Sequence, residues 1–201
     1  WYRQHLEQGL SYHEDRGEGL DNYHVGGSAG CGGTALWIDG RREPLETYTR
    51  ASLQESTPKF VIFTLTYHRN INGDDYSEEK RITLRMGSRM YSVESTFTKN
   101  GEVAVGLPVA VGVATHDGKA TVAVDFMDPA TIVKAVPAYD EGAPDTGHAL
   151  FIAHTDEKGR IFYHAGYGWE RANVIQSEAD WQAYLQRFAA ETLAARAAAK
   201  Q

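Results

Sequence analysis

The stretch "RITLRMGSRMYSVESTFTKNG", residues 81–101, decides the fold class of this chain. Its two runs 81–86 and 90–98 are rich in the β-branched and aromatic residues that are typical of strands. Apolar residues occupy alternate positions in the second run, as expected for a strand with one buried face. The pair Asn100-Gly101 is the strongest short hairpin signal in the chain. This stretch therefore predicts neighbouring antiparallel strands.

The rest of the chain repeats this pattern of short strands and turns. Further strands are predicted at 34–39, 48–54, 60–68, within 102–127, and at 130–139, 147–155 and 160–169. Turns are predicted at Asp39-Gly40 and at 116–118. Strands at short spacing without intervening helices are typical of a sandwich or barrel. We expect an all-β fold, a large antiparallel β-sandwich, with one C-terminal α-helix.

The C-terminal helix is predicted to begin at Ser177. The sequence "SEAD" is a capping-box pattern in which Asp180 replaces the more usual Glu or Gln. Apolar side chains then recur at helical spacing, at Trp181, Tyr184, Leu185 and Phe188. We expect this helix to cover one face or edge of a sheet and to fray after Leu193.

Composition limits the classes of partner. The 201 residues are enough for a single domain, 1–201, with a core of its own. A net charge of −7 without a Lys/Arg cluster argues against nucleic acid and against a membrane surface as partners. No apolar run has the length of a membrane span. The lone Cys31 cannot form an internal disulfide, and the opening "WYRQHLEQ" suggests an excised piece.

The segment "YHEDRGEGLDNYHVGGSAGCGG", residues 12–33, is dense in acids, bases and glycines. Its glycines fit neither a dinucleotide fingerprint nor a P-loop, so nucleotide binding is not favoured. We expect them to let the backbone turn tightly or closely approach a ligand or another strand. The carboxylates could form a hydrogen-bonded loop. Together with the imidazoles they could also bind a divalent metal, although no zinc motif is present.

The same segment offers groups for catalysis. His13 could act as a base and Tyr12 or Tyr23 as an acid, because imidazole titrates near neutral pH and a phenol can donate a proton. Two carboxylates flanking a bond would instead indicate glycoside hydrolysis. Sequence cannot give their separation; the candidates are Glu14, Asp15 and Asp21. Cys31 lies between glycines and is a poor candidate for a nucleophile.

A second aromatic group lies in "FYHAGYGWE", residues 162–170. His164, Tyr167 and Trp169 could hydrogen-bond and stack on a sugar ring, with a core position as the alternative for Trp169. In a strand, Tyr163 and His164 face opposite ways, so at most one of them can face a given pocket.

Three blocks of the chain resemble a bacterial family known only as a domain of unknown function. They are residues 12–33, 81–98 and 161–189, the last reading "IFYHAGYGWERANVIQSEADWQAYLQRFA". This family occurs among polysaccharide-utilisation enzymes, near unsaturated-uronide hydrolases. The resemblance implies a β-sandwich similar to that of sugar mutarotases and several polysaccharide lyases. It also implies a periplasmic or secreted location and additional sequence before the start of this chain, which would then be the C-terminal part of a longer protein.

The positions that match the family include the acidic segment and the later Gly166, Gly168 and Trp169. The family has a small residue where Tyr167 stands, which puts a stacking role of Tyr167 in doubt. We expect a lyase or dehydratase that acts by β-elimination on uronate-containing oligosaccharides, with His13 as base and Tyr23 as acid. The expected substrate-binding residues are Glu14, Asp15, Arg16, Asp21, His164 and Trp169.

In this hypothesis an Arg such as Arg16 would grip the sugar carboxylate with its planar fork. No cofactor is assigned, and a divalent metal stays an open alternative. Two other functions remain: a glycoside hydrolase with paired carboxylates, and a non-catalytic carbohydrate-binding sandwich. The fold cannot choose among the three functions, because sandwiches support all of them.

Overall fold

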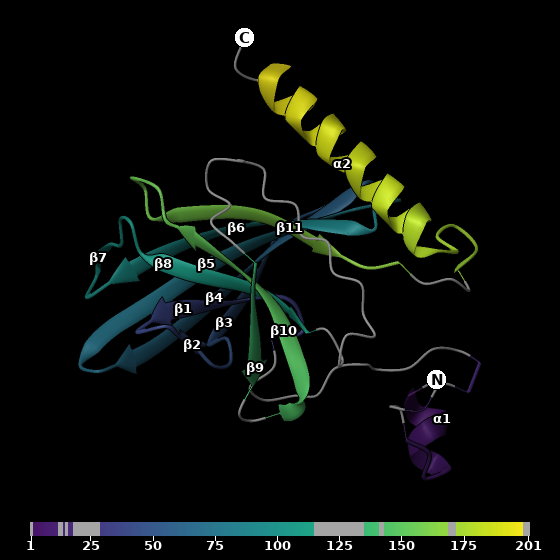
Figure 1. Cartoon of the computed structure of the whole chain (residues 1–201), viewed down its shortest axis with the longest axis horizontal. Helices are drawn as coiled ribbons and strands as arrows, with labels where there is room; N and C mark the ends of the chain where they lie inside the picture. Colours follow the sequence, from purple (N-terminus) through teal and green to yellow (C-terminus); the bar gives the residue numbers. More distant parts are fainter. Residues whose placement is uncertain are drawn as a thin grey trace.

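The computed structural model of the chain describes residues 2–11, 14, 16–17, 29–114, 135–140, 143–168 and 172–198. Two antiparallel sheets make up most of it (Figure 1). The first sheet has the strand order β2-β1-β8-β10-β9. Its strands are β1 Cys31–Ile38, β2 Arg41–Glu43, β8 Pro108–Ala114, β9 Ala135–Asp140 and β10 Ala143–His154.

The second sheet has the order β11-β6-β5-β4-β3, and the short β7 also pairs with β6. Its strands are β3 Arg50–Ser56, β4 Phe60–Ile71, β5 Asp74–Arg85, β6 Met90–Lys99, β7 Glu102–Val103 and β11 Arg160–Gly166. The helices are α1 Tyr2–Glu7 and α2 Glu178–Ala198. The predicted all-β sandwich with a C-terminal helix is therefore confirmed. Two details were wrong: α1 was not expected, and α2 continues past Leu193 to Ala198.

Three two-residue turns connect neighbouring strands. Both central residues have positive φ at Asp39-Gly40 (50° and 75°), Asn72-Gly73 (56° and 91°) and Asn100-Gly101 (52° and 83°). Such angles match the twist of paired strands and favour Asn, Asp and Gly. The first and third turns were predicted. The second joins β4 to β5, so both strands extend beyond the predicted 60–68 and 81–86.

The main core lies between the two sheets. We call the face of the six-stranded sheet that meets the other sheet its inner face. Strand alternation places Val93, Phe97 and Tyr163 on it, and all three are almost completely buried. They pack in one cluster with Leu36, Val109 and Val111 of the opposite sheet.

Helix α2 packs against the outer face of the six-stranded sheet. The hydroxyl of Ser177 accepts the backbone N–H of Asp180 at 3.1 Å, as the capping pattern predicts. Trp181 and Leu185 then bury their side chains against Met90 and Ile175. The first turns of α2 lie near β11 and the later turns extend away from the sheets (Figure 1). The predicted covering of a sheet face is thus confirmed for the start of the helix.

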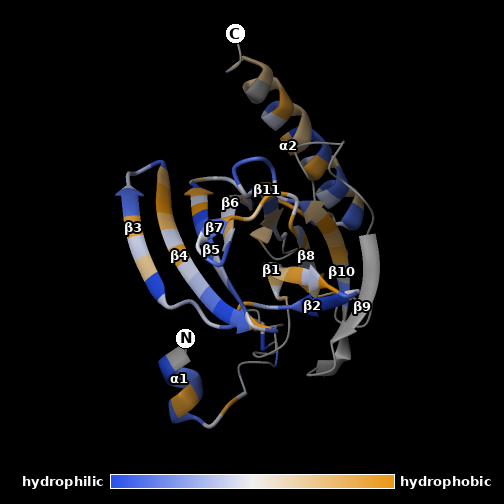
Figure 2. Ribbon diagram, turned by 90° about the vertical axis from the view of Figure 1, so that its left-hand side faces the viewer, coloured by the Kyte–Doolittle hydropathy of each residue, from blue (hydrophilic) through white to orange (hydrophobic). Residues whose placement is uncertain are grey.

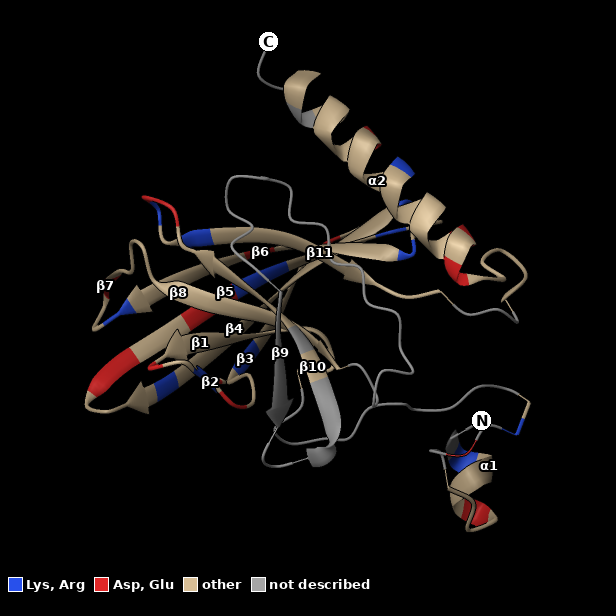
Figure 3. Ribbon diagram, in the orientation of Figure 1, with Lys and Arg blue, Asp and Glu red and all other residues tan. Residues whose placement is uncertain are grey.

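Polarity changes along the long strands. Strand β4 is apolar over its first half and hydrophilic over its second (Figure 2). Charged residues of both signs are interspersed along the strands and turns (Figure 3). Of the helices that the structure describes, neither combines the length and the apolar character needed to cross a bilayer.

Candidate functional site

A cavity of about 340 Å³ opens on the inner face of the six-stranded sheet. We call it the inner cavity. Its size lies within the range of roughly 300–1,000 Å³ that is typical of small-molecule pockets. The residues that line it come from the glycine-rich segment and from four strands of the six-stranded sheet: Ala29, Cys31, Gly32, Gly33, Phe63, Tyr67, Lys80, Ile82, Leu84, Tyr91 and Tyr163.

The glycine-rich segment forms one wall because its backbone approaches the opposite sheet closely. Gly32 has φ +85°, and a Cβ there would lie 2.5 Å from the hydroxyl of Tyr91 and 2.6 Å from the Cβ of Ala165. The Tyr163 hydroxyl donates to the Gly32 carbonyl at 2.8 Å, and the Tyr91 hydroxyl donates to the Cys31 carbonyl. The expectation that a glycine of this segment permits close approach to another strand is confirmed for Gly32.

Lys80 brings a buried cation to the inner cavity. Its side chain is 9 % exposed, and Nζ lies 3.6 Å from Oε1 of Glu78 and 4.9 Å from the centre of the Tyr67 ring. This ammonium group is paired with the Glu78 carboxylate. An ammonium has three N–H donors, so Lys80 can keep this ion pair and also donate to an oxygen of a ligand in the inner cavity. The site is therefore suited to a ligand that supplies oxygen acceptors.

Tyr67 lies beside this cation and keeps its proton at neutral pH. Burial, followed by the negative charge of Glu78 and the neighbouring Tyr48, raises the pKa of Tyr67 to about 12. Burial and nearby negative charge each disfavour the phenolate. Tyr67 can therefore donate a proton or a hydrogen bond to a ligand, but it is poorly suited to act as a base.

Glu78 lies behind Lys80 and connects the two sheets. It is 2 % exposed. Its carboxylate accepts the Thr34 hydroxyl of β1, which lies 2.9 Å and 2.8 Å from its two oxygens, and the Ser95 hydroxyl of β6 at 2.6 Å. Hydrogen bonds of this kind stabilise a buried carboxylate.

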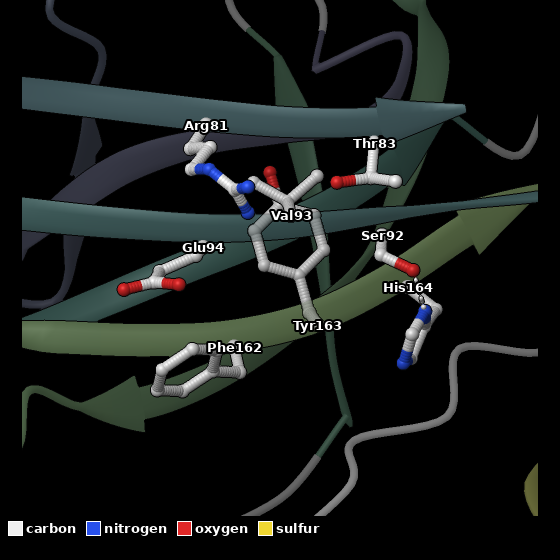
Figure 4. Close-up of a pocket in the computed structure, with 8 residues that line it drawn as sticks. All are labelled: Arg81, Thr83, Ser92, Val93, Glu94, Phe162, Tyr163 and His164. Atoms are coloured by element: carbon white, nitrogen blue, oxygen red, sulfur yellow. Dashed lines mark hydrogen bonds between the residues drawn. The ribbon is translucent and has the colours of Figure 1, made fainter. Parts of the chain in front are cut away.

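A second, smaller pocket lies on the outer face of the same sheet (Figure 4). Its volume is about 110 Å³, which is enough for a few water molecules but not for a sugar ring. It is lined by Arg81, Thr83, Ser92, Val93, Glu94, Phe162, Tyr163 and His164.

His164, which the sequence suggested as a sugar-binding residue, lies in this outer pocket. It is 5 % exposed, its Nδ1 is 2.9 Å from the Ser92 hydroxyl, and its ring meets the ring of Phe188 edge to face at 4.9 Å. Tyr163, its neighbour in the chain, faces the inner cavity. His164 thus faces away from Lys80 and Tyr67, as the alternation of β11 requires.

Two other predicted residues lie on the surface. The guanidinium of Arg16 and the carboxylate of Glu14 form an ion pair at 2.6 Å, with side chains 47 % and 62 % exposed. The remaining predicted residues lie outside the described part of the chain: His13, Asp15, Asp21, Tyr23 and Trp169. Their roles stay predictions, as does the divalent metal. Within the described ranges, no three His, Cys, Asp or Glu side chains are grouped so that they could hold a metal ion.

Sequence reasoning missed Lys80, Tyr67 and Glu78. The predicted strand 81–86 left the charged run "DDYSEEK", residues 74–80, outside, although β5 begins at Asp74. The missed signal was the Asn72-Gly73 turn. Counting from it, the inner-face positions of β5 are Tyr76, Glu78, Lys80 and Ile82. Glu78 and Lys80 occupy inner-face positions at which the alternating pattern of a half-buried strand normally has apolar residues.

Comparison with other proteins places the chain in a family. It is 27 % identical over 210 residues to an uncharacterised protein, P7, of Formosa agariphila, and the match covers 94 % of this chain and 51 % of that protein. The chain therefore spans about half the length of this curated relative. No solved structure matches it. Residues 1–195 match the family described as a domain of unknown function (DUF4861), and the chain belongs to this family.

Proposed function

We propose that the chain is the sugar-binding part of a carbohydrate-active enzyme. In this proposal the enzyme is a lyase or dehydratase that acts by β-elimination on uronate-containing oligosaccharides, and the inner cavity holds the acidic sugar. The observation that carries the proposal is the Lys80 ammonium, a cation that lines the inner cavity together with the phenol of Tyr67 and is held by Glu78.

A uronate carboxylate in the inner cavity would accept hydrogen bonds from the Lys80 ammonium. In β-elimination the proton next to this carboxylate is removed, and negative charge develops on the carboxylate oxygens. An ammonium held near those oxygens stabilises the transition state more than the ground state. The Lys80 ammonium is positioned before the substrate binds, because it is paired with Glu78 and lies over the Tyr67 ring.

The proposed reaction needs a base and an acid. The base removes the proton from C5 of the uronate, and that C–H electron pair forms the C4–C5 double bond. The C4–O bond breaks, and the leaving oxygen takes a proton from the acid. His13 remains the proposed base. Two phenols are proposed for the acid, Tyr23 from the sequence and Tyr67 from the structure, which lines the inner cavity beside Lys80.

The proposal also includes a periplasmic or secreted location, where polymeric substrates are met. It rests on the resemblance to proteins of polysaccharide utilisation and on the sandwich fold.

The test is incubation of the protein with a panel of uronate oligosaccharides, followed by absorbance and mass together. A lyase gives a conjugated double bond with cleavage and no added water. A dehydratase gives the double bond with loss of one water, whereas a hydrolase adds water without new absorbance. Binding without turnover would support the carbohydrate-binding alternative and overturn the enzyme proposal.

Four variants then assign the roles: His13→Ala, Tyr23→Phe, Tyr67→Phe and Lys80→Met. We expect His13→Ala to abolish elimination and only one of the two phenol variants to do so. Retained turnover in Lys80→Met would place the substrate elsewhere and overturn the assignment of the inner cavity.

A further inference from the structure

Glu78 is an unusual residue for the centre of a sandwich. Its side chain is 2 % exposed, and it lies on the inner face of β5, where neighbouring strands place apolar residues. Burying an ionised carboxylate is costly, and replacing a buried ion pair by apolar residues is often neutral or stabilising. A contribution to stability therefore does not account well for Glu78.

The carboxylate is held from three directions. Thr34 reaches it from the opposite sheet, Ser95 from the neighbouring strand, and Lys80 lies two residues along the same strand. Two hydroxyl donors in fixed strands restrict where the carboxylate can be. Lys80 has a long and flexible side chain, so its ammonium could take many positions. The ion pair with the fixed Glu78 carboxylate restricts the ammonium to positions close to that carboxylate.

The same carboxylate also acts on the phenol of the cavity. Its negative charge adds to burial in raising the pKa of Tyr67, and it also raises that of the buried Tyr163. Lys80 lies over the Tyr67 ring at 4.9 Å and so contacts both groups. The Lys80 ammonium, the Tyr67 phenol and the Glu78 carboxylate thus interact with one another.

We propose that Glu78 is a positioning residue of the inner cavity: fixed by Thr34 and Ser95, it holds the Lys80 ammonium over the Tyr67 ring and in reach of the substrate carboxylate. This inference rests on the proposed function for its catalytic meaning. Its structural part, the control of Lys80 and Tyr67 by Glu78, can be tested without any substrate.

The test compares Glu78→Gln with Glu79→Gln. Glu79 is the next residue of β5, is exposed, and faces the opposite way, so its substitution changes the same charge without touching the cavity. The titration of Tyr67 is followed by NMR of ¹³C-labelled tyrosine, and the Lys80 side chain by NMR of ¹³C-labelled lysine. Tyr67→Phe and Lys80→Met assign the two signals.

We expect Glu78→Gln to lower the pKa of Tyr67 from about 12, although burial, the larger cause, still holds it above 10.0, and to broaden or shift the Lys80 signal. Glu79→Gln should change neither. If both signals are unchanged in Glu78→Gln, or change equally in Glu79→Gln, the inference is overturned. These readouts need no turnover, so they stay decisive even if no uronate is converted.

With an active substrate, Glu78→Gln should lower kcat by about 10–100-fold, the loss typical of a misplaced catalytic group, and move the alkaline limb of the pH profile to lower pH. Should Glu78→Gln fail to fold, Thr34→Val removes one donor and keeps the shape of the side chain. It should shift the Tyr67 titration and the Lys80 signal, and Thr34→Ser should leave both near their original values. Unchanged signals in Thr34→Val would contradict the proposal.

Discussion

Lys80 and Tyr67 lie on neighbouring strands of one sheet, with the ammonium nitrogen 4.9 Å from the centre of the phenol ring. Lys80 contacts the face of the ring, where the negative side of its quadrupole attracts a cation. The pair lines a cavity large enough for a sugar ring. This arrangement makes the inner face of the six-stranded sheet the candidate site.

Lys80→Met should weaken binding of an acidic oligosaccharide by about tenfold or more, because a charged hydrogen bond contributes about 1.5–3 kcal/mol. Titration calorimetry with a uronate oligosaccharide measures the change. Lys99→Met is the matched control, because Lys99 also pairs with a carboxylate and lies over a tyrosine ring but is 44 % exposed. Equal effects of the two substitutions would rule out a specific role of Lys80.

Because of Tyr67, the free energy of unfolding depends on pH in the alkaline range. Its pKa is about 12 in the folded chain against 10.0 in the unfolded chain, so below pH 10 both states carry the proton. Between these values the unfolded state loses its proton first, and the free energy of unfolding falls as pH rises.

Tyr67→Phe should therefore lose stability less steeply than the unmodified protein above pH 10. Urea unfolding at a series of alkaline pH values measures the difference. Tyr167→Phe is the control, since Tyr167 is 71 % exposed. Parallel curves for Tyr67→Phe and the unmodified protein would show that the pKa of Tyr67 is not raised.

Gly32→Ala should destabilise the fold by about 2–5 kcal/mol. The added Cβ would meet Tyr91 and Ala165 at 2.5 and 2.6 Å, and the positive φ is unfavourable for alanine. Gly40→Ala separates the two causes, because Gly40 has φ +75° and open space around it. That variant should lose only about 1–2 kcal/mol in urea unfolding. Equal losses would mean that the close approach at Gly32 is unimportant.

Trp181→Ala should release the start of α2 from the outer face of the sheet. Trp181 is 7 % exposed, packs in a cluster with Met90 and Leu185, and stacks on Tyr184 at 5.4 Å. Truncating a buried Trp costs about 3–5 kcal/mol of packing. Hydrogen exchange should therefore speed up in α2 and not in β5, whereas the exposed Gln186→Ala should have no effect. A uniform loss of protection would show that α2 is part of the same cooperative unit as the sheets.

Much of the fold could be predicted because strand signals are local. Alternation in 90–98 and the turns at Asp39-Gly40 and Asn100-Gly101 depend on residues close in sequence, and the structure confirms them. Strand β5 was only half predicted, because Glu78 and Lys80 stand at inner positions where the pattern expects apolar residues. The two charges compensate each other only once the strand has formed its sheet.

The sequence by itself determined the all-β class, the capped C-terminal helix and the need for glycines next to Cys31, since each depends on propensity, turn chemistry or backbone freedom over a few residues. Only the tertiary structure decided the candidate site. Thr34 and Glu78 are 44 residues apart in the chain, yet they share hydrogen bonds across the two sheets, and Tyr67 and Lys80 meet because β4 pairs with β5. The packing of the sheets decides which polar groups are buried together, and burial and neighbouring charges then decide the pKa values and contacts of those groups. No local sequence pattern contains that information.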